Sequence, residues 1–136
     1  MVEGDEAEGV IVAVKVIEAV NRGFSPERAF QLMQDADLVL DVIDLSKSID
    51  TPRQLERVRG RIIGRAGRSR EQIEDMTGTS ISVHGKTISI IGAFEQVKTA
   101  RTAVEMLVNG VPHETVFSFL DKKKRESKQD VIGYYY

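Results

Sequence analysis

Five arginines surround two glycines that stand three positions apart in the segment RGRIIGRAGRSREQI, residues 59–73. The glycines, Gly64 and Gly67, allow a turn that another backbone can approach closely, because glycine has no Cβ atom. Arginine carries a planar, permanently charged fork that suits phosphate groups and stacks on flat rings. A helix that starts after such a turn directs its first amide groups and its dipole at an anion. The segment is therefore a candidate phosphate- or nucleic-acid-binding turn.

Enzymatic alternatives for this turn have little support in the sequence. It lacks the patterns G-x-x-x-x-G-K-[ST] and G-x-G-x-x-G, and its glycines stand between two predicted helices rather than after a strand. The chain has no cysteine and two histidines, His84 near a turn and His113 after a proline. A metal site or a nucleophilic pair is therefore not expected. The sequence predicts a binding protein that is not an enzyme and takes no cofactor.

The charge of the chain is strongly segregated, although the total is −2. Residues 1–52 carry 11 acidic and 4 basic side chains, whereas residues 53–70 carry seven arginines against the single acid Glu56. Such a block creates a local positive potential, and a solvated helix face is the alternative for Arg53 and Arg57. No apolar run approaches the ~18 residues of a membrane span, and the acidic start does not resemble a signal peptide. We expect a cytoplasmic location without membrane association.

Residues 9–23, GVIVAVKVIEAVNRG, are apolar on nearly all sides and fit two kinds of element. Their valine and isoleucine content favours a strand, whereas their length and the terminal Gly23 favour a helix with a glycine cap. Ser25 and Pro26 then begin a second helix. The buried side of this helix is expected to hold Ala29, Phe30, Leu32 and Met33. The apolar segment needs cover, either by packing back on the rest of the chain or by self-association.

The rest of the chain predicts the order strand, helix, helix, strand, strand, helix. The predicted pieces are a strand over 38–46, helices from Thr51 and from Ser69, a strand pair within 79–92 and a helix over 94–108. Both of the first two helices start with a capping pattern, Thr51 with Gln54 and Ser69 with Gln72. The predicted fold class is α+β, with a three-stranded sheet covered on one face by three helices.

The residues around the glycine turn resemble the KH module, which clamps about four nucleotides of a single strand of nucleic acid. The matching landmarks are Ile62-Ile63-Gly64-Arg65-Ala66-Gly67, Ile73, Thr77-Gly78 and Ile81. Arg70 departs from the pattern, because the module usually has an aliphatic residue there. We expect Arg70 to face the groove and to meet a base or a phosphate. The resemblance implies a type I KH fold over residues 38–110.

The resemblance also assigns roles to individual residues. The backbone clamp is expected at Gly64, Arg65, Ala66 and Gly67. The side chains expected to meet phosphates or bases are Arg61, Arg68 and Arg70. The apolar floor of the groove is expected from Ile63, Ile73, Ile81 and Val83. For Ile73 and Ile81 the alternative is an ordinary position in the core.

A wider resemblance, over residues 9–128, is to the second half of the archaeal Pno/Dim-type KH ribosome-assembly proteins. The stretches that carry it include GFSPERAF, GRIIGRAGRSREQIEDMTG and NGVPHETVFSFL. It implies binding of single-stranded RNA at the 3′ end of small-subunit ribosomal RNA during ribosome maturation. It also implies two candidate partners, the endonuclease that trims this RNA and the alpha subunit of translation initiation factor two.

Proteins of this family carry two KH modules, and the chain is too short for both. Residues 1–37 are therefore expected to be a helical N-terminal extension, the remnant of a first module, and residues 111–136 a C-terminal helix or tail. A homodimer through residues 9–36 would cover the apolar segment. The rival hypothesis is a protein-interaction module that docks on a nuclease or a translation factor and binds little RNA itself. Tyr134–Tyr136 match nothing in the family.

Overall fold

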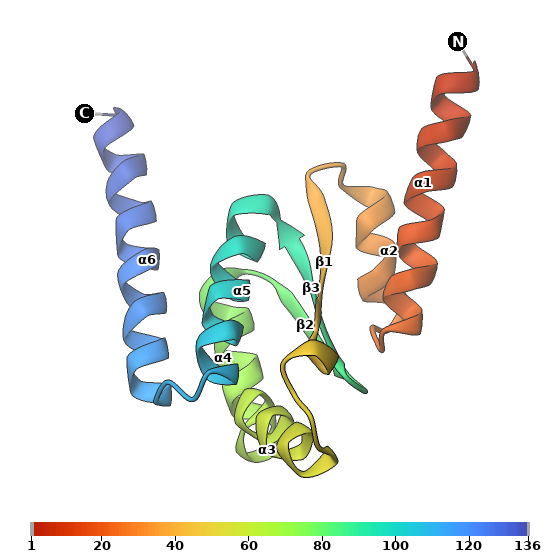
Figure 1. Ribbon diagram of the computed structural model, residues 1–136. Coiled ribbons are helices and arrows are strands. Elements are labelled where there is room, and N and C mark those ends of the chain that lie inside the picture. The colour runs from red at the N-terminus through yellow and green to blue at the C-terminus, as the bar shows by residue number, and fades with distance from the viewer. Residues whose placement is uncertain (1, 136) are drawn as a thin grey trace.

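A three-stranded antiparallel sheet separates two groups of helices in the computed structural model of the chain (Figure 1). The structure describes the backbone of residues 2–135 and the side chains of residues 7–127, so the side chains of Tyr134–Tyr136 lie outside the described residues. The strands are β1 (Leu38–Asp44), β2 (Ser80–His84) and β3 (Thr87–Ala93). Their order is β1-β3-β2, which makes β3 the central strand and leaves β2 at an edge.

Three helices cover one face of the sheet, as the sequence predicts. They are α3 (Pro52–Ile63), α4 (Arg68–Thr77) and α5 (Phe94–Val108). The main core lies between them and the sheet, and its fully buried members include Ile62, Ile73, Ile81, Ile88, Ile90, Val104 and Leu107. The order β1-α3-α4-β2-β3-α5 confirms the predicted α+β class and is the order of a type I KH fold.

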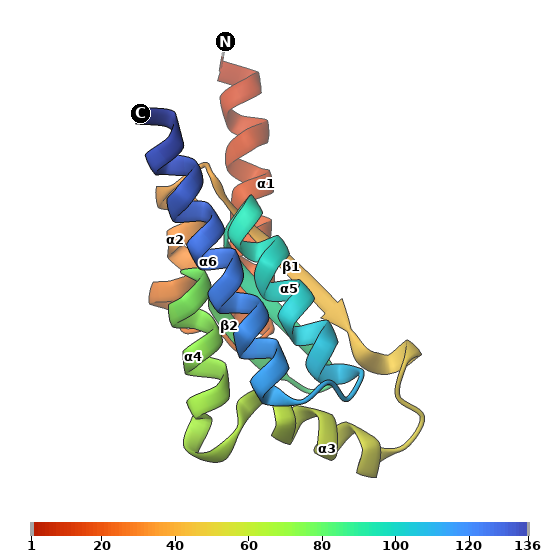
Figure 2. The ribbon, with the colours of Figure 1, turned by 90° about the vertical axis from the view of Figure 1, so that its left-hand side faces the viewer.

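The last helix, α6 (His113–Tyr135), forms an outer layer on this side of the molecule. Figure 2 shows α6 running alongside α5, with α4 on its other side. Val116 and Leu120 of α6 are buried and belong to the main core. The predicted domain limits, residues 38 and 110, fall between α2 and β1 and between α5 and α6, and they stay a prediction.

Local capping signals set the starts of two helices, α2 (Pro26–Gln34) and α3. The Ser25 hydroxyl accepts a hydrogen bond from the amide of Arg28 at 3.3 Å at the start of α2. The Thr51 hydroxyl accepts a hydrogen bond from the amide of Gln54 at 3.2 Å, and Pro52 occupies the first turn of α3. The predicted capping role of Ser69 is wrong, because α4 already begins at Arg68 and Gly67 stands at the cap position. Ser69 is buried inside the first turn, and no hydrogen-bond partner reaches its hydroxyl.

The other face of the sheet carries the two N-terminal helices, α1 (Val2–Asn21) and α2 (Pro26–Gln34). The ambiguous segment 9–23 is therefore a helix, and it packs back on the chain as one of the two predicted alternatives requires (Figure 1). A second, smaller core joins Val16, Ala19, Phe24, Ala29 and Leu32 to Ile91 of β3 and to Leu38 and Leu40 of β1. Gly23, at φ +99°, ends the turn after α1 as a glycine cap would.

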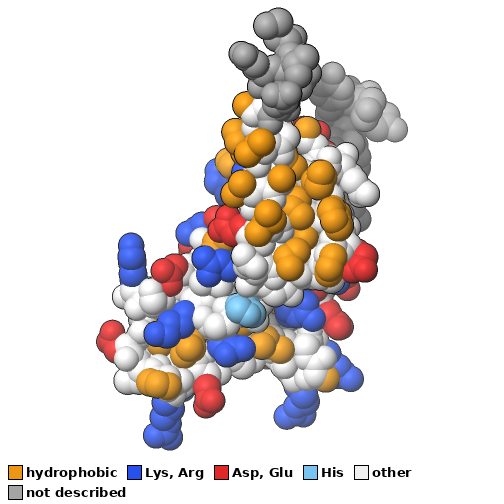
Figure 3. Space-filling view, turned by 90° about the vertical axis from the view of Figure 1, so that its right-hand side faces the viewer, with side chains coloured by type: hydrophobic (Ala, Val, Ile, Leu, Met, Phe, Trp, Pro, Cys, Tyr) orange, Lys and Arg blue, Asp and Glu red, His pale blue; other side chains and the backbone are white. Residues whose placement is uncertain are grey.

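The N-terminal helices nevertheless leave apolar side chains in solvent. We call this surface the α1–α2 face; it comprises Val10, Ile11, Val14, Ile17, Val20, Phe30 and Met33. Figure 3 shows an area of exposed hydrophobic side chains, in orange, over the N-terminal part of the molecule. The predicted burial of Phe30 and Met33 is wrong, because only the narrow stripe of Ala29 and Leu32 packs against the rest of the chain. Within residues 2–135, no helix combines the length and the apolar character needed to cross a membrane.

Candidate nucleic-acid interface

The turn between α3 and α4 has a left-handed backbone at three of its four positions. The φ angles are +74° at Gly64, +55° at Ala66 and +75° at Gly67. At Gly64 a Cβ atom would lie 2.5 Å from the Cβ and 2.9 Å from the amide nitrogen of Ser69, so only glycine fits. Ala66 adopts a positive φ although it carries a Cβ atom, and this conformation costs roughly 1–2 kcal/mol. The backbone is thus folded into a tight turn that leaves Ala66 exposed.

Positive charge is concentrated on this turn. The side chains of Arg65 and Arg68 are exposed, and no side chain caps the first amides of α4. The positive end of the α4 dipole therefore points into the same region as the two arginines. A recess of about 470 Å³ opens beside the turn towards α6, and Arg57, Gln72 and Phe117 also line it.

A groove of about 490 Å³ opens on the other side of the turn, between α4 and the edge strand β2. Its apolar lining includes Ile63 and Val83, which are half-buried, and Arg70 stands at its rim. The groove is closed on its far side by the turn between α1 and α2. The residues that this turn contributes are Gly23, Phe24, Ser25 and Arg28.

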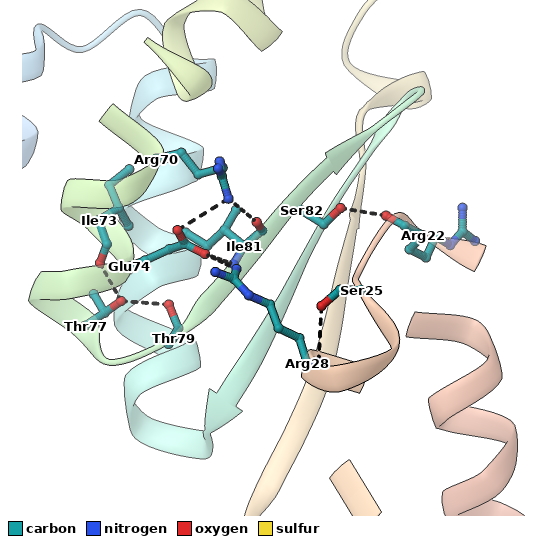
Figure 4. A network of polar contacts seen from close by, with 10 residues as sticks. All are labelled: Arg22, Ser25, Arg28, Arg70, Ile73, Glu74, Thr77, Thr79, Ile81 and Ser82. Atoms are coloured by element: carbon teal, nitrogen blue, oxygen red, sulfur yellow. Dashed lines mark hydrogen bonds and ion pairs between the residues drawn. The ribbon is translucent and has the colours of Figure 1, made fainter. Parts of the chain in front are cut away.

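A network of polar contacts crosses this groove (Figure 4). Its centre is Glu74, whose carboxylate accepts hydrogen bonds from the Ile81 amide at 2.7 Å and from Arg28 at 3.0 Å. Arg70 donates to the Ile81 carbonyl at 3.2 Å and pairs with Glu74 at 3.4 Å. Because β2 is an edge strand, these side chains satisfy backbone groups that no neighbouring strand reaches. Two arginines share one carboxylate, which leaves the groove positively charged.

The structure brings most of the predicted site residues together. The turn and the groove hold Ile63, Gly64, Arg65, Ala66, Gly67, Arg68, Arg70 and Val83. Ile73 and the side chain of Ile81 are instead 0% and 1% exposed and belong to the main core. Both side chains thus take the core position that the sequence left open as the alternative, and Ile81 also lines the groove.

Arg61 is also turned away from the groove. Its guanidinium donates to the carbonyls of Leu107, at 3.1 Å, and Val111. Those carbonyls lie at the end of α5 and just after it, where backbone acceptors lack helical partners and the dipole favours a cation. The imidazole Nε2 of His113 lies 2.8 Å from the carbonyl oxygen of Arg61. Arg61 therefore connects α3 to the joint between α5 and α6 through two of its nitrogens. It also lines the recess beside the turn, and its contact with RNA stays a prediction.

The sequence analysis missed the groove residues Gly23, Phe24, Ser25, Arg28 and Ser82, and it missed Glu74 at the centre of the polar network. Arg28 and Glu74 are 46 positions apart, and their contact depends on how the N-terminal helices pack on the sheet. The sequence carries no signal for such a contact. Among the side chains of residues 7–127, no group of histidine, aspartate and glutamate is arranged to hold a metal ion.

Comparison with known proteins identifies the family. A family model described as eukaryotic type KH-domain (KH-domain type I) matches residues 39–125. The chain belongs to this family. The match confirms the predicted KH resemblance and fold, and the matched residues extend into the first half of α6.

Relatives of this KH protein are of the Pno/Dim type, as the sequence predicts. A KH domain-containing protein of Methanocaldococcus jannaschii is 40% identical over 114 residues, which are 84% of this chain and 50% of that protein. The RNA-binding protein PNO1 of Oryzias latipes is 32% identical over 117 residues, 85% of this chain and 48% of the relative. The chain spans about half the length of the curated relatives it matches.

Two crystal structures from Pyrococcus horikoshii are also similar to this KH protein. Dim2p has a TM-score of 0.77 and 48% identity, over 83% of this chain and 65% of that one. The complex of a/eIF2alpha with aDim2p and rRNA contains a chain with a TM-score of 0.80 and 47% identity, over 86% of this chain and 63% of that one.

Proposed function

We propose that this KH domain binds single-stranded RNA, and that its target is the 3′ end of small-subunit ribosomal RNA during ribosome maturation. The observation that carries the proposal is the Gly64–Gly67 turn, whose left-handed backbone, exposed arginines and uncapped helix start converge on one place. Relatives named pre-rRNA-processing protein PNO1 and a similar chain in a complex with rRNA support RNA as the ligand.

The geometry of the turn and the groove suggests how a single strand of RNA would lie on them. The phosphodiester backbone would rest on Gly64–Gly67, where the absence of side-chain bulk lets it approach the main chain. Arg65 and Arg68 would supply counter-charge, together with the first amides of α4. The bases would then turn into the groove, over Ile63 and Val83, with Arg70 at the rim to meet a base face or edge.

The protein would act as a binding module and not as an enzyme. We propose the alpha subunit of translation initiation factor two as one partner, because the complex from Pyrococcus horikoshii contains a/eIF2alpha beside aDim2p and rRNA. The rRNA-trimming endonuclease is a second proposed partner, on the family resemblance alone. The lack of cysteine in the chain agrees with a role in a reducing compartment, for which we propose the cytoplasm.

Fluorescence anisotropy with a short RNA that copies the 3′ end of small-subunit ribosomal RNA tests this function. We expect binding that weakens with salt, with a slope of log affinity against log salt of about −0.7 for each phosphate contact. In the variant Arg65→Asp with Ala66→Asp, two carboxylates would face the phosphates and abolish binding. This variant should still fold, since aspartate is among the residues that best tolerate the left-handed conformation of position 66.

A matched control is Lys47→Asp with Ser48→Asp. This control changes the net charge by the same amount as the test variant, at two adjacent exposed positions. These positions precede α3, whereas the candidate turn follows that helix. We expect this control to keep the affinity of the native chain within a small factor. Absence of binding at low salt, or binding that is indifferent to the aspartates at positions 65 and 66, would refute the proposed function.

A protein-interaction role is the second candidate, and the α1–α2 face favours it. Seven large apolar side chains stand 42–62% exposed on two adjacent helices, an arrangement typical of a surface that a partner covers. The two functions differ in the residues that they need. Docking through the α1–α2 face does not use the arginines of the turn, so the aspartate variant separates them.

A further inference from the structure

The turn between α1 and α2 lies directly against the edge strand of the sheet. The hydroxyl of Ser82, on β2, donates to the Arg22 carbonyl at 2.8 Å. A Cβ atom on Gly23 would lie 2.7 Å from that same hydroxyl, so the glycine permits the close approach. The N-terminal helices therefore supply one wall of the groove, opposite the wall made by α4 (Figure 4).

Arg28 extends from this wall across the groove. Its guanidinium contacts the Glu74 carboxylate at 3.0 Å, yet the side chain remains 45% exposed. Glu74 also accepts from the Ile81 amide and from Arg70, so its single negative charge serves two arginines. An ion pair with so exposed a partner contributes little in water, so another anion of the same charge can compete with Glu74 for Arg28. A phosphate offers such an anion, with oxygens that match the guanidinium fork.

We propose that Arg28 is a nucleic-acid contact, and that it releases Glu74 to bind a phosphate of the strand that lies in the groove. The proposal rests on the RNA-binding function proposed above. The binding site is then composite: the Gly64–Gly67 turn holds the backbone from one side and the α1–α2 turn holds it from the other. Arg70 keeps Glu74 paired when Arg28 leaves, so no carboxylate is left without a partner inside the groove.

The test compares Arg28→Ala with the native chain in the same anisotropy assay. Loss of one phosphate contact should lower the salt slope by about 0.7 and weaken binding about fivefold near 0.1 M salt. Unfolding in urea, followed by circular dichroism, shows whether the variant keeps its fold. If Arg28→Ala leaves both the affinity and the salt slope unchanged, the proposal is overturned.

Two control variants separate a contact with RNA from a purely structural role. Arg22→Ala removes the same charge from the same turn, but the guanidinium of Arg22 points away from Glu74 (Figure 4). Ser82→Ala removes the other hydrogen bond that ties the turn to β2 and changes no charge. Both should bind nearly as the native chain does. Equal losses in Arg28→Ala and Arg22→Ala, or in Arg28→Ala and Ser82→Ala, would overturn the proposal.

The assay distinguishes a failure of the RNA-binding function from a failure of this inference alone. If the native chain does not bind, or if it ignores the aspartates at positions 65 and 66, both proposals fall together. If those aspartates abolish binding while Arg28→Ala has no effect, the Gly64–Gly67 site stands and the composite site does not.

Discussion

At the scale of single residues, the turn between α3 and α4 depends on backbone conformations that most residues avoid. Gly64 has no room for a side chain, whereas Ala66 adopts a positive φ with one. Strain of this kind persists where the surrounding structure imposes it, commonly at binding sites. The strained alanine therefore supports the view that the shape of this turn, and not merely its charge, is what binds the ligand.

Gly64→Ala should lower the free energy of unfolding by about 2 kcal/mol or more, because the new methyl group meets the backbone of Ser69 in a left-handed position. Gly60 offers a control in which the same substitution should change the free energy of unfolding in the opposite direction. It lies inside α3 with no atom within 4 Å of its missing Cβ, so Gly60→Ala should raise the free energy of unfolding by about 0.8–1 kcal/mol. Urea denaturation measures both, and effects of the same sign would contradict this account of the turn.

At the scale of elements, Arg61 links helices that are far apart in the sequence. It emerges from the last turn of α3 and donates to two carbonyls at the end of α5 and in the joint before α6. This contact holds the last turn of α3, which ends at the cap residue Gly64, against the joint that precedes α6. We infer that Arg61 serves the site mainly by holding the end of α3 in place.

Arg61→Ala should lower the free energy of unfolding by about 2 kcal/mol, since it leaves two half-buried carbonyls without their charged donor. RNA binding by the folded variant should fall much less than in the variant with aspartates at positions 65 and 66. Arg53→Ala, at an exposed position in the first turn of the same helix, should change stability by less than about 0.5 kcal/mol. A loss of RNA affinity in Arg61→Ala without a loss of stability would show that the arginine contacts RNA after all.

At the scale of the whole molecule, the layers are α6, then α3 to α5, then the sheet, then α2 and α1 (Figure 1). One side of the N-terminal pair is buried on β1 and β3, and the other side forms the α1–α2 face. Burying one large aliphatic side chain contributes about 1.5–3 kcal/mol, so covering several of them can drive association. A homodimer through residues 9–36 remains our prediction for the chain by itself.

Sedimentation equilibrium at micromolar concentrations tests this prediction. Ile17→Glu places a charge inside the α1–α2 face and should shift the chain from dimer to monomer. Ser118→Glu adds the same charge at an exposed position of α6, on the other side of the molecule, and should leave the dimer intact. A native chain that sediments as a monomer at all concentrations would contradict self-association through this face.

Local signals in the sequence determined the element order from β1 to α5, the starts of α2 and α3, and the position and character of the Gly64–Gly67 turn. These features were predictable because they depend on residues within one or two helical turns of each other: capping hydroxyls, a proline, glycines and the spacing of apolar side chains. Their spacing also carried the family resemblance that the KH match confirms.

Only the tertiary structure decided which side chains line the candidate site. It turned Arg61 towards α5, placed Ile73 in the core, and made segment 9–23 a helix that covers the second face of the sheet. It also brought Arg28 to Glu74 across 46 positions of sequence. The reason is the same in each case: the direction of a side chain on a helix follows from what the helix packs against, and that partner lies far away along the chain.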